Sequence, residues 1–110
     1  MQTTLVTWGS SMSDANFNKL TPAQTERLAL LSEELGEAIQ VIGKILRHGY
    51  ESYSPVDPKQ ETNKTALEQE LGDVAFAASL MSKANDISLG KVTDFKSEKE
   101  QRKNKYLHHN

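Results

Sequence analysis

The sequence contains no cysteine, and this absence narrows its chemistry. Disulfides, thiolate zinc sites and a cysteine nucleophile are excluded, and nothing points to an oxidising compartment. The chain also shows neither a basic stretch followed by an apolar run of the signal-peptide type nor an apolar run of about eighteen residues. We therefore expect a cytoplasmic protein with no membrane association.

An excess of one charge sign is also lacking, since 13 Lys and Arg face 15 Asp and Glu for a formal net charge of −2. This balance argues against a general nucleic-acid binder, whose affinity comes from a basic surface. It leaves small phosphorylated ligands open. The 110 residues, 36% of them hydrophobic, fit one small domain over residues 1–110. Because so small a domain has a modest core, we expect at least a dimer.

Three helical patterns account for most of the chain. A capping box at Thr21 predicts a first helix that ends at Gly49. A second helix is expected from about residue 63 to 85, capped by Thr62 or Asn63 and buried on more than one side. An exposed third helix is expected after Ser88, running towards residue 106. A surface loop at 50–62 and a short helix or ordered arm at 1–20 complete an all-α chain.

The first helix has a stripe of large apolar residues at intervals of three and four. This pattern is typical of an amphipathic helix about seven turns long. The residues of the stripe are Leu28, Leu31, Leu35, Ala38, Ile39, Ile42, Ile45 and Leu46.

Two acidic motifs lie inside these helical patterns, at residues 33–37 (Glu-Glu-Leu-Gly-Glu) and 70–73 (Glu-Leu-Gly-Asp). Their five carboxylates stand among apolar residues, where like charges are unfavourable unless they protonate or bind a cation. If the two long helices pack antiparallel, the acidic faces meet near mid-helix and form an oxygen-rich pocket. Gly36 and Gly72 then indicate a close helix approach at the acids. Either motif alone is more often a solvated helix face, but the pair favours a metal site.

The ligand types restrict the metal. Carboxylates without cysteine, and without histidine at helical spacing from the acids, suit magnesium or manganese better than zinc or copper. His48, His108 and His109 lie outside both motifs. The Glu-x-x-His pairs of di-iron bundles are absent, as are the Gly-x-x-x-x-Gly-Lys phosphate loop, the nucleophile elbow and His-Glu-x-x-His.

Glu-Glu-x-x-Glu followed by Glu-x-x-Asp on successive helices resembles the all-α nucleoside triphosphate pyrophosphohydrolases of the MazG type. The resemblance covers roughly residues 21–106 and includes Leu-Ser-Glu-Glu-Leu-Gly-Glu-Ala, Glu-Leu-Gly-Asp-Val and the ending Lys-Asn-Lys-Tyr at 103–106. It implies a helical bundle completed by assembly into a homodimer or homotetramer. It also implies Mg²⁺-dependent hydrolysis of a nucleoside triphosphate to the monophosphate and pyrophosphate, with Mn²⁺ as a substitute metal, in the control of the nucleotide pool.

The resemblance also implies roles for individual residues. Glu33 would lie in the outer shell of the metal or help to activate water, and Lys103 with Asn104 would bind the substrate. The metal ligands would be Glu34, Glu37, Glu70 and Asp73. Further cations for the negatively charged substrate crowd the third helix and the end of the first. They are Lys96, Lys99, Arg102, Lys105, Lys44 and Arg47.

Two departures from the family pattern bear on the substrate. The 32 residues between Glu37 and Glu70 form a long spacer because of the insert at 50–62, and Leu107 replaces the proline that usually follows the terminal tyrosine. An aromatic residue could stack on a base, although in a small helical domain such residues are more often core. The candidates are Trp8, Phe17, Tyr50 and Tyr53.

Two other functions fit the same residues. One is a phosphoribosyl-ATP pyrophosphatase, which resembles this fold and chemistry. The other is a non-catalytic helical module for binding or oligomerisation, in which the acids pair with basic residues of a neighbouring protomer. Such buried ion networks are seldom favourable overall.

Overall fold

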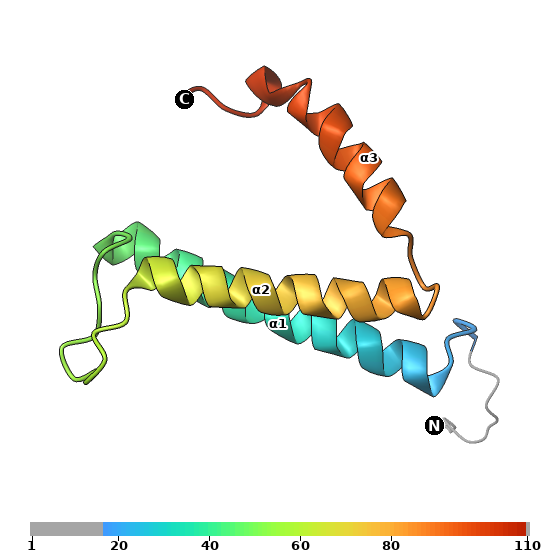
Figure 1. Cartoon of the computed structure of the whole chain (residues 1–110), viewed down its shortest axis with the longest axis horizontal. Helices are drawn as coiled ribbons and strands as arrows, with labels where there is room; N and C mark the ends of the chain where they lie inside the picture. The colour runs from blue at the N-terminus through green and yellow to red at the C-terminus, as the bar shows by residue number, and fades with distance from the viewer. Residues whose placement is uncertain (1–16, 110) are drawn as a thin grey trace.

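The computed structural model describes residues 17–109, which are helical apart from turns and loops. α1 (Pro22–His48) and α2 (Asn63–Lys83) are long, and α3 (Leu89–Glu100) is followed by the short 3-10 helix η1 (Lys103–Lys105) (Figure 1). No strand occurs in this part of the chain, which confirms the all-α class. None of the helices described is long and apolar enough to cross a membrane. The predicted helix or arm at 1–20 lies mostly outside the described residues, as does Trp8.

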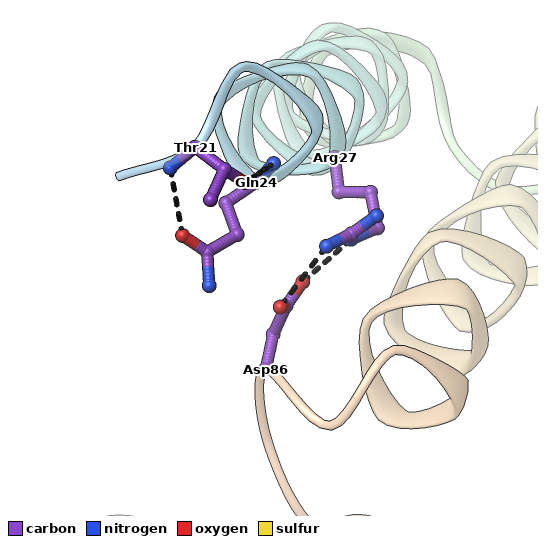
Figure 2. A network of polar contacts seen from close by, with 4 residues as sticks. All are labelled: Thr21, Gln24, Arg27 and Asp86. Carbon is purple, nitrogen blue, oxygen red and sulfur yellow. Dashed lines mark hydrogen bonds and ion pairs between the residues drawn. The ribbon is translucent and has the colours of Figure 1, made fainter. Parts of the chain in front are cut away.

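Each helix begins where the local sequence predicts, and α1 also ends there. The Thr21 hydroxyl accepts from the Gln24 backbone N–H at 3.1 Å, while the Gln24 side-chain oxygen accepts from the Thr21 N–H at 2.9 Å (Figure 2). Gly49 ends α1 at φ +92°, a conformation that favours glycine. Thr62 caps α2 and Ser88 caps α3. The third helix is shorter than predicted, because turns at 101–102 separate it from η1.

α1 and α2 lie side by side and run antiparallel (Figure 1). Along α1, less exposed residues recur at intervals of three and four: Leu31, Glu34, Ala38, Val41 and Ile45. The matching set on α2 is Leu67, Glu70, Val74, Ala77 and Met81. This spacing is that of a coiled-coil seam, in which each helix presents one narrow stripe to its neighbour. We call these ten residues the α1–α2 seam.

The seam contains only part of the apolar stripe of α1. Much of the large apolar stripe faces solvent in the single chain, with Ile39 at 67% and Leu46 at 82% of their full exposure. Leu28, Leu35 and Ile42 are also exposed, whereas the acid-bearing side of α1 faces α2, as the sequence predicts for antiparallel helices. The prediction that α2 is buried on more than one side is wrong for the single chain. Leu71 and Phe76 on α2 are more than half exposed.

The glycines of the acidic motifs do not mark a close approach of α1 to α2. A methyl group added at Gly36 or at Gly72 would meet nothing within 4 Å. Both residues are exposed. The prediction that tight helix packing explains them is therefore wrong within one chain.

α3 is directed away from the α1–α2 pair and makes few contacts with α2 (Figure 1). No residue of α3 is buried, as the sequence predicts for this helix. The radius of gyration of 19.3 Å exceeds the value of about 13 Å for a compact domain of this length. One chain by itself therefore forms an open arrangement with a small core.

An ion pair fastens the start of α1 to the turn after α2. Arg27 Nε donates to Asp86 Oδ2 at 2.6 Å, and a terminal guanidinium nitrogen donates to Oδ1 at 3.1 Å (Figure 2). The carboxylate side chain keeps only 10% of its full exposure and the arginine side chain 24%. Two parallel charge-assisted hydrogen bonds fix the relative orientation of both groups. This pair closes the end of the seam opposite the 50–62 loop.

Candidate functional site

Four carboxylates from the two long helices converge near the middle of the seam. Glu34 and Glu37 come from α1, and Glu70 and Asp73 come from α2. One oxygen from each lies within 4.8 Å of the oxygens of the other three. This geometry confirms the prediction that the two acidic faces meet.

Helix periodicity explains why these four side chains gather. Each motif supplies two acids three residues apart, which places both on one side of a helix. Glu34 and Glu70 occupy seam positions, so antiparallel packing brings them between the helices. Glu37 and Asp73 flank the seam on the same side, and Asp73 is the most exposed of the four.

Burial leaves two of these oxygens without a partner. Glu34 Oε1 and Glu70 Oε1 are shielded from solvent and have no hydrogen-bond partner among the described residues. Desolvation raises the pKa of Glu34, and the nearby charges of Glu37 and Asp73 raise it further. Desolvation also raises the pKa of Glu70, followed by hydrogen bonding to Glu37 and by its charge. The cluster thus concentrates negative charge that no ion pair within residues 17–109 compensates.

The cluster fits a hard divalent cation. Its donors are carboxylate oxygens alone, which is the ligand type of Mg²⁺, Mn²⁺ and Ca²⁺. Two of those oxygens are buried and unpaired, and such groups are unfavourable unless a proton or a cation meets them. Glu34, Glu37, Glu70 and Asp73 are the residues that would hold the ion.

Glu33 does not belong to the four-residue cluster. It is exposed on α1, next to Glu34, and its charge contributes slightly to the raised pKa of Glu34. Glu33 therefore lies beside the four residues that would bind the metal and is not one of them.

The predicted substrate-binding residues lie in two separate places. Lys103 and Asn104 line a hollow of about 310 Å³ near the C-terminus, on the η1 segment that follows α3. Within the single chain this segment stands apart from the acid-bearing helix pair (Figure 1). Lys44 and Arg47 instead line a hollow of about 550 Å³ formed by the end of α1, the 50–62 insert and the start of α2. We call this second hollow the loop pocket.

The loop pocket includes Tyr53, one of the predicted stacking candidates, together with residues for which the sequence predicts no role in the site. His48, Ser52, Ser54 and Asn63 line it together with Tyr53 and Pro55. Asn63 was predicted only as a possible helix cap. The serines and tyrosines of the insert beside a basic helix end are a weak signal for a polar pocket. Only the folded loop brings these residues together with Asn63 of α2.

A comparison with protein families identifies a match. The model of the MazG nucleotide pyrophosphohydrolase domain matches residues 23–108, well over half of the chain. The matched range includes both acidic motifs, the insert and η1. No match to the chain was found among curated proteins or among solved structures.

Proposed function

The chain belongs to the MazG nucleotide pyrophosphohydrolase family, and from this premise we propose that it hydrolyses a nucleoside or deoxynucleoside triphosphate to the monophosphate and pyrophosphate with Mg²⁺. The observation that carries the proposal is the carboxylate cluster between α1 and α2. Its four donor oxygens lie within 4.8 Å of one another, and two of its carboxylates have a buried oxygen without a partner. A cation that satisfies these oxygens also attracts the phosphates of a nucleotide.

The reaction needs charge neutralisation, an activated water and a place for the proton. A bound Mg²⁺ supplies the first and lowers the pKa of a coordinated water. We assign Glu33, the exposed carboxylate beside the cluster, to accept the proton of the attacking water. The water oxygen bonds to the α-phosphorus, the bond from that phosphorus to the α,β-bridging oxygen breaks, and pyrophosphate leaves. Mn²⁺ has the same ligand preference and is expected to replace Mg²⁺.

We also propose that the protein acts as a homodimer or homotetramer. The core of one chain is small, with Ala38, Val41, Ala77 and Met81 as its buried hydrophobic residues in the described part. The exposed large apolar residues of α1 lie along one side of the helix. They are Leu28, Leu35, Ile39, Ile42 and Leu46. Such a stripe is unfavourable in water and typical of a surface covered by another protein. A second copy of this chain is the occupant that the open arrangement of α3 and the small core favour.

Assembly also bears on Lys103 and Asn104, which we retain as proposed substrate contacts. Since η1 stands apart from the acids within one chain, this role requires assembly to bring an η1 segment to the carboxylate cluster. No acidic residue lines the hollow at Lys103 and Asn104, so that hollow offers no carboxylate for a metal ion by itself.

The function is tested by following pyrophosphate release from each common nucleoside and deoxynucleoside triphosphate, with Mg²⁺ and with a chelator. We expect Mg²⁺-dependent monophosphate formation from one or a few nucleotides. Glu70→Gln removes a charge from the cluster and is expected to abolish turnover, whereas Glu68→Gln, an exposed carboxylate on the same helix, should keep it. Phosphoribosyl-ATP is assayed separately.

Three results would change the proposal. Activity on phosphoribosyl-ATP alone would assign the chain to that reaction. Turnover that survives Glu70→Gln would show that the cluster does not hold the catalytic metal. Absence of turnover on every substrate, with no metal-dependent stabilisation, would favour the non-catalytic module.

A further inference from the structure

The loop pocket is a built feature of the fold. The insert returns to the start of α2 through backbone hydrogen bonds from Asn63 N to Ser52 O at 2.9 Å and from Lys64 N to Tyr50 O at 2.8 Å. The Asn63 side chain donates to the Gly49 carbonyl at 3.1 Å and thereby joins the end of α1 to the start of α2. These bonds hold the walls of the pocket in place without using the side chains of Lys44, Arg47 or His48.

A second set of hydrogen bonds orders the outer part of the insert. The Asp57 carboxylate accepts from the Lys59 N–H at 3.0 Å and from the Glu61 N–H at 2.9 Å. These bonds lower the pKa of Asp57, so the group stays ionised and keeps the turn closed at neutral pH. Ser54 Oγ accepts from the Val56 N–H at 3.4 Å. The loop therefore has an internal framework of its own.

The chemistry of the lining suits a phosphate group. Lys44, Arg47 and His48 contribute two permanent positive charges and an imidazole, and Ser52, Ser54, Tyr53 and Asn63 contribute hydroxyl and amide groups. No carboxylate lines the pocket. Neither Lys44 nor Arg47 forms an ion pair with any residue in the described part of the chain. Guanidinium and ammonium groups near hydroxyls are a donor set for phosphate oxygens.

The position of the pocket connects it with the carboxylate cluster. Lys44 follows Glu37 by seven residues on α1, and Asn63 precedes Glu70 by seven residues on α2. Seven residues are almost two whole helical turns, so Lys44 projects from nearly the same side of α1 as Glu37, roughly 10 Å farther along the axis. The distance between the α and γ phosphorus atoms of a triphosphate is shorter than this interval, and the flexible four-carbon side chain of Lys44 can span the remainder. The loop pocket and the carboxylate cluster therefore lie along the same pair of helices, α1 and α2.

We propose that the loop pocket binds the terminal phosphate of the substrate, so that the triphosphate lies along the α1–α2 pair with its leaving pyrophosphate towards the insert. This inference rests on the proposed function. It assigns to the 50–62 insert a role in recognising a polyphosphate chain. It also places the nucleoside on the other side of the carboxylate cluster, away from the pocket.

Equilibrium binding tests the proposal without requiring turnover. Inorganic pyrophosphate is titrated into the full-length chain in the presence of Mg²⁺, and the same is done with the double variant Lys44→Ala with Arg47→Ala. Loss of the charged donors is expected to weaken pyrophosphate binding by roughly tenfold or more. Lys64→Ala, an exposed lysine next to Asn63 that does not line the pocket, serves as the matched control and should stay within about twofold of the wild type.

A nucleoside monophosphate distinguishes the terminal phosphate from the α-phosphate. The double variant should bind it as the wild type does, because a monophosphate does not reach the pocket. Equal weakening of monophosphate and pyrophosphate binding would overturn the proposal, as would equal weakening by Lys64→Ala or no detectable binding of pyrophosphate to the wild type. Unfolding curves confirm that the variants are folded. Relative to the double variant, Arg47→Lys in place of Arg47→Ala should restore part of the affinity for pyrophosphate, because it keeps the positive charge.

The same variants separate this inference from the proposed function. If no triphosphate is hydrolysed but pyrophosphate binding still depends on Lys44 and Arg47, the proposed function fails and the phosphate assignment stands. If triphosphates are hydrolysed while the double variant keeps the wild-type KM and pyrophosphate affinity, the function stands and the phosphate assignment fails.

Discussion

Glu34 and Glu70 occupy seam positions at which an apolar side chain would pack against the opposite helix. In the metal-free chain this placement raises the pKa of both carboxyls above their ordinary value of 4.5, chiefly through desolvation. At pH values between the unfolded-state pKa and the folded-state pKa of each carboxyl, the folded state therefore binds more protons than the unfolded state. Stability from these two groups is highest at acid pH and falls as the pH rises through that interval.

This sign predicts the behaviour of an amide variant. Glu34→Gln with Glu70→Gln removes two ionisations that are unfavourable in the metal-free chain. The Tm of the double variant minus that of the wild type, both measured with a chelator, should increase as the pH rises from about 4 to 7. Glu68→Gln, exposed on α2, should show no such trend. A difference that stays constant over this pH range would mean that neither carboxyl is desolvated in solution.

In the wild type, metal addition should offset the loss of stability that ionisation of Glu34 and Glu70 causes. An ion that binds the folded chain raises the free energy of unfolding by about 2.7 kcal/mol when its concentration is a hundredfold above Kd. We expect Mg²⁺ and Mn²⁺ to raise the Tm of the wild type and to leave that of Glu70→Gln nearly unchanged. Thermal unfolding at increasing metal concentration measures this. Equal stabilisation of both proteins would place the metal elsewhere.

At the scale of the helical elements, the sequence allowed prediction of the helix starts but not of how much of each apolar stripe is buried in one chain. Capping at Thr21, Thr62 and Ser88 depends on neighbouring residues and can be read locally. The packed face of α1 depends on its partner. Since Glu34 interrupts the apolar repeat of the seam, the richer stripe through Ile39 and Leu46 gave the stronger periodic signal.

The candidate site shows the same division between local and distant information. The convergence of the four carboxylates could be predicted, because each pair follows from helical spacing and the loop length permits antiparallel helices. The loop pocket could not be predicted, because its walls come from backbone hydrogen bonds of the insert. Neither could the Arg27–Asp86 pair, whose partners are 59 residues apart with no pattern linking them.

The Arg27–Asp86 pair should contribute to stability at neutral pH. Hydrogen bonding to Arg27 lowers the pKa of Asp86 below its ordinary value of 3.8. Its contribution is present above the unfolded-state pKa and is lost as the pH falls through the folded-state pKa. Asp86→Asn should lower the Tm by several degrees at pH 7, and the difference from the wild type should shrink towards pH 2 to 3, an estimate from the usual range of carboxyl titration.

The exposed ion pair between Lys96 and Glu100 provides a control for this prediction. Its side chains retain 70% and 63% of their full exposure, so solvent screens their attraction. Lys96→Ala should therefore change the Tm much less than Asp86→Asn. Similar shifts for the two variants would mean that the Arg27–Asp86 pair acts only as a surface contact.

At the scale of the whole molecule, the described part of one chain leaves a row of large apolar side chains of α1 exposed to water. α1 is about 40 Å long, and its exposed stripe extends from Leu28 to Leu46. A face of this length can supply an interface of roughly 800 Å² per partner, the size of a standard specific contact. The α3 helix, which has no buried residue, adds further surface that assembly can cover.

Charge placed on this stripe should dissociate the assembly. We expect the wild type to have a solution mass that is a multiple of 12.3 kDa and a Tm that rises with protein concentration. Ile39→Glu with Leu46→Glu should give a species near the mass of one chain with a concentration-independent Tm, because burying two carboxylates in an apolar interface is unfavourable. Light scattering after size-exclusion chromatography measures the mass. Val56→Glu changes an exposed apolar residue of the insert and should leave the mass unchanged. A monomeric wild type, or a double variant of unchanged mass, would show that a second copy does not cover this face.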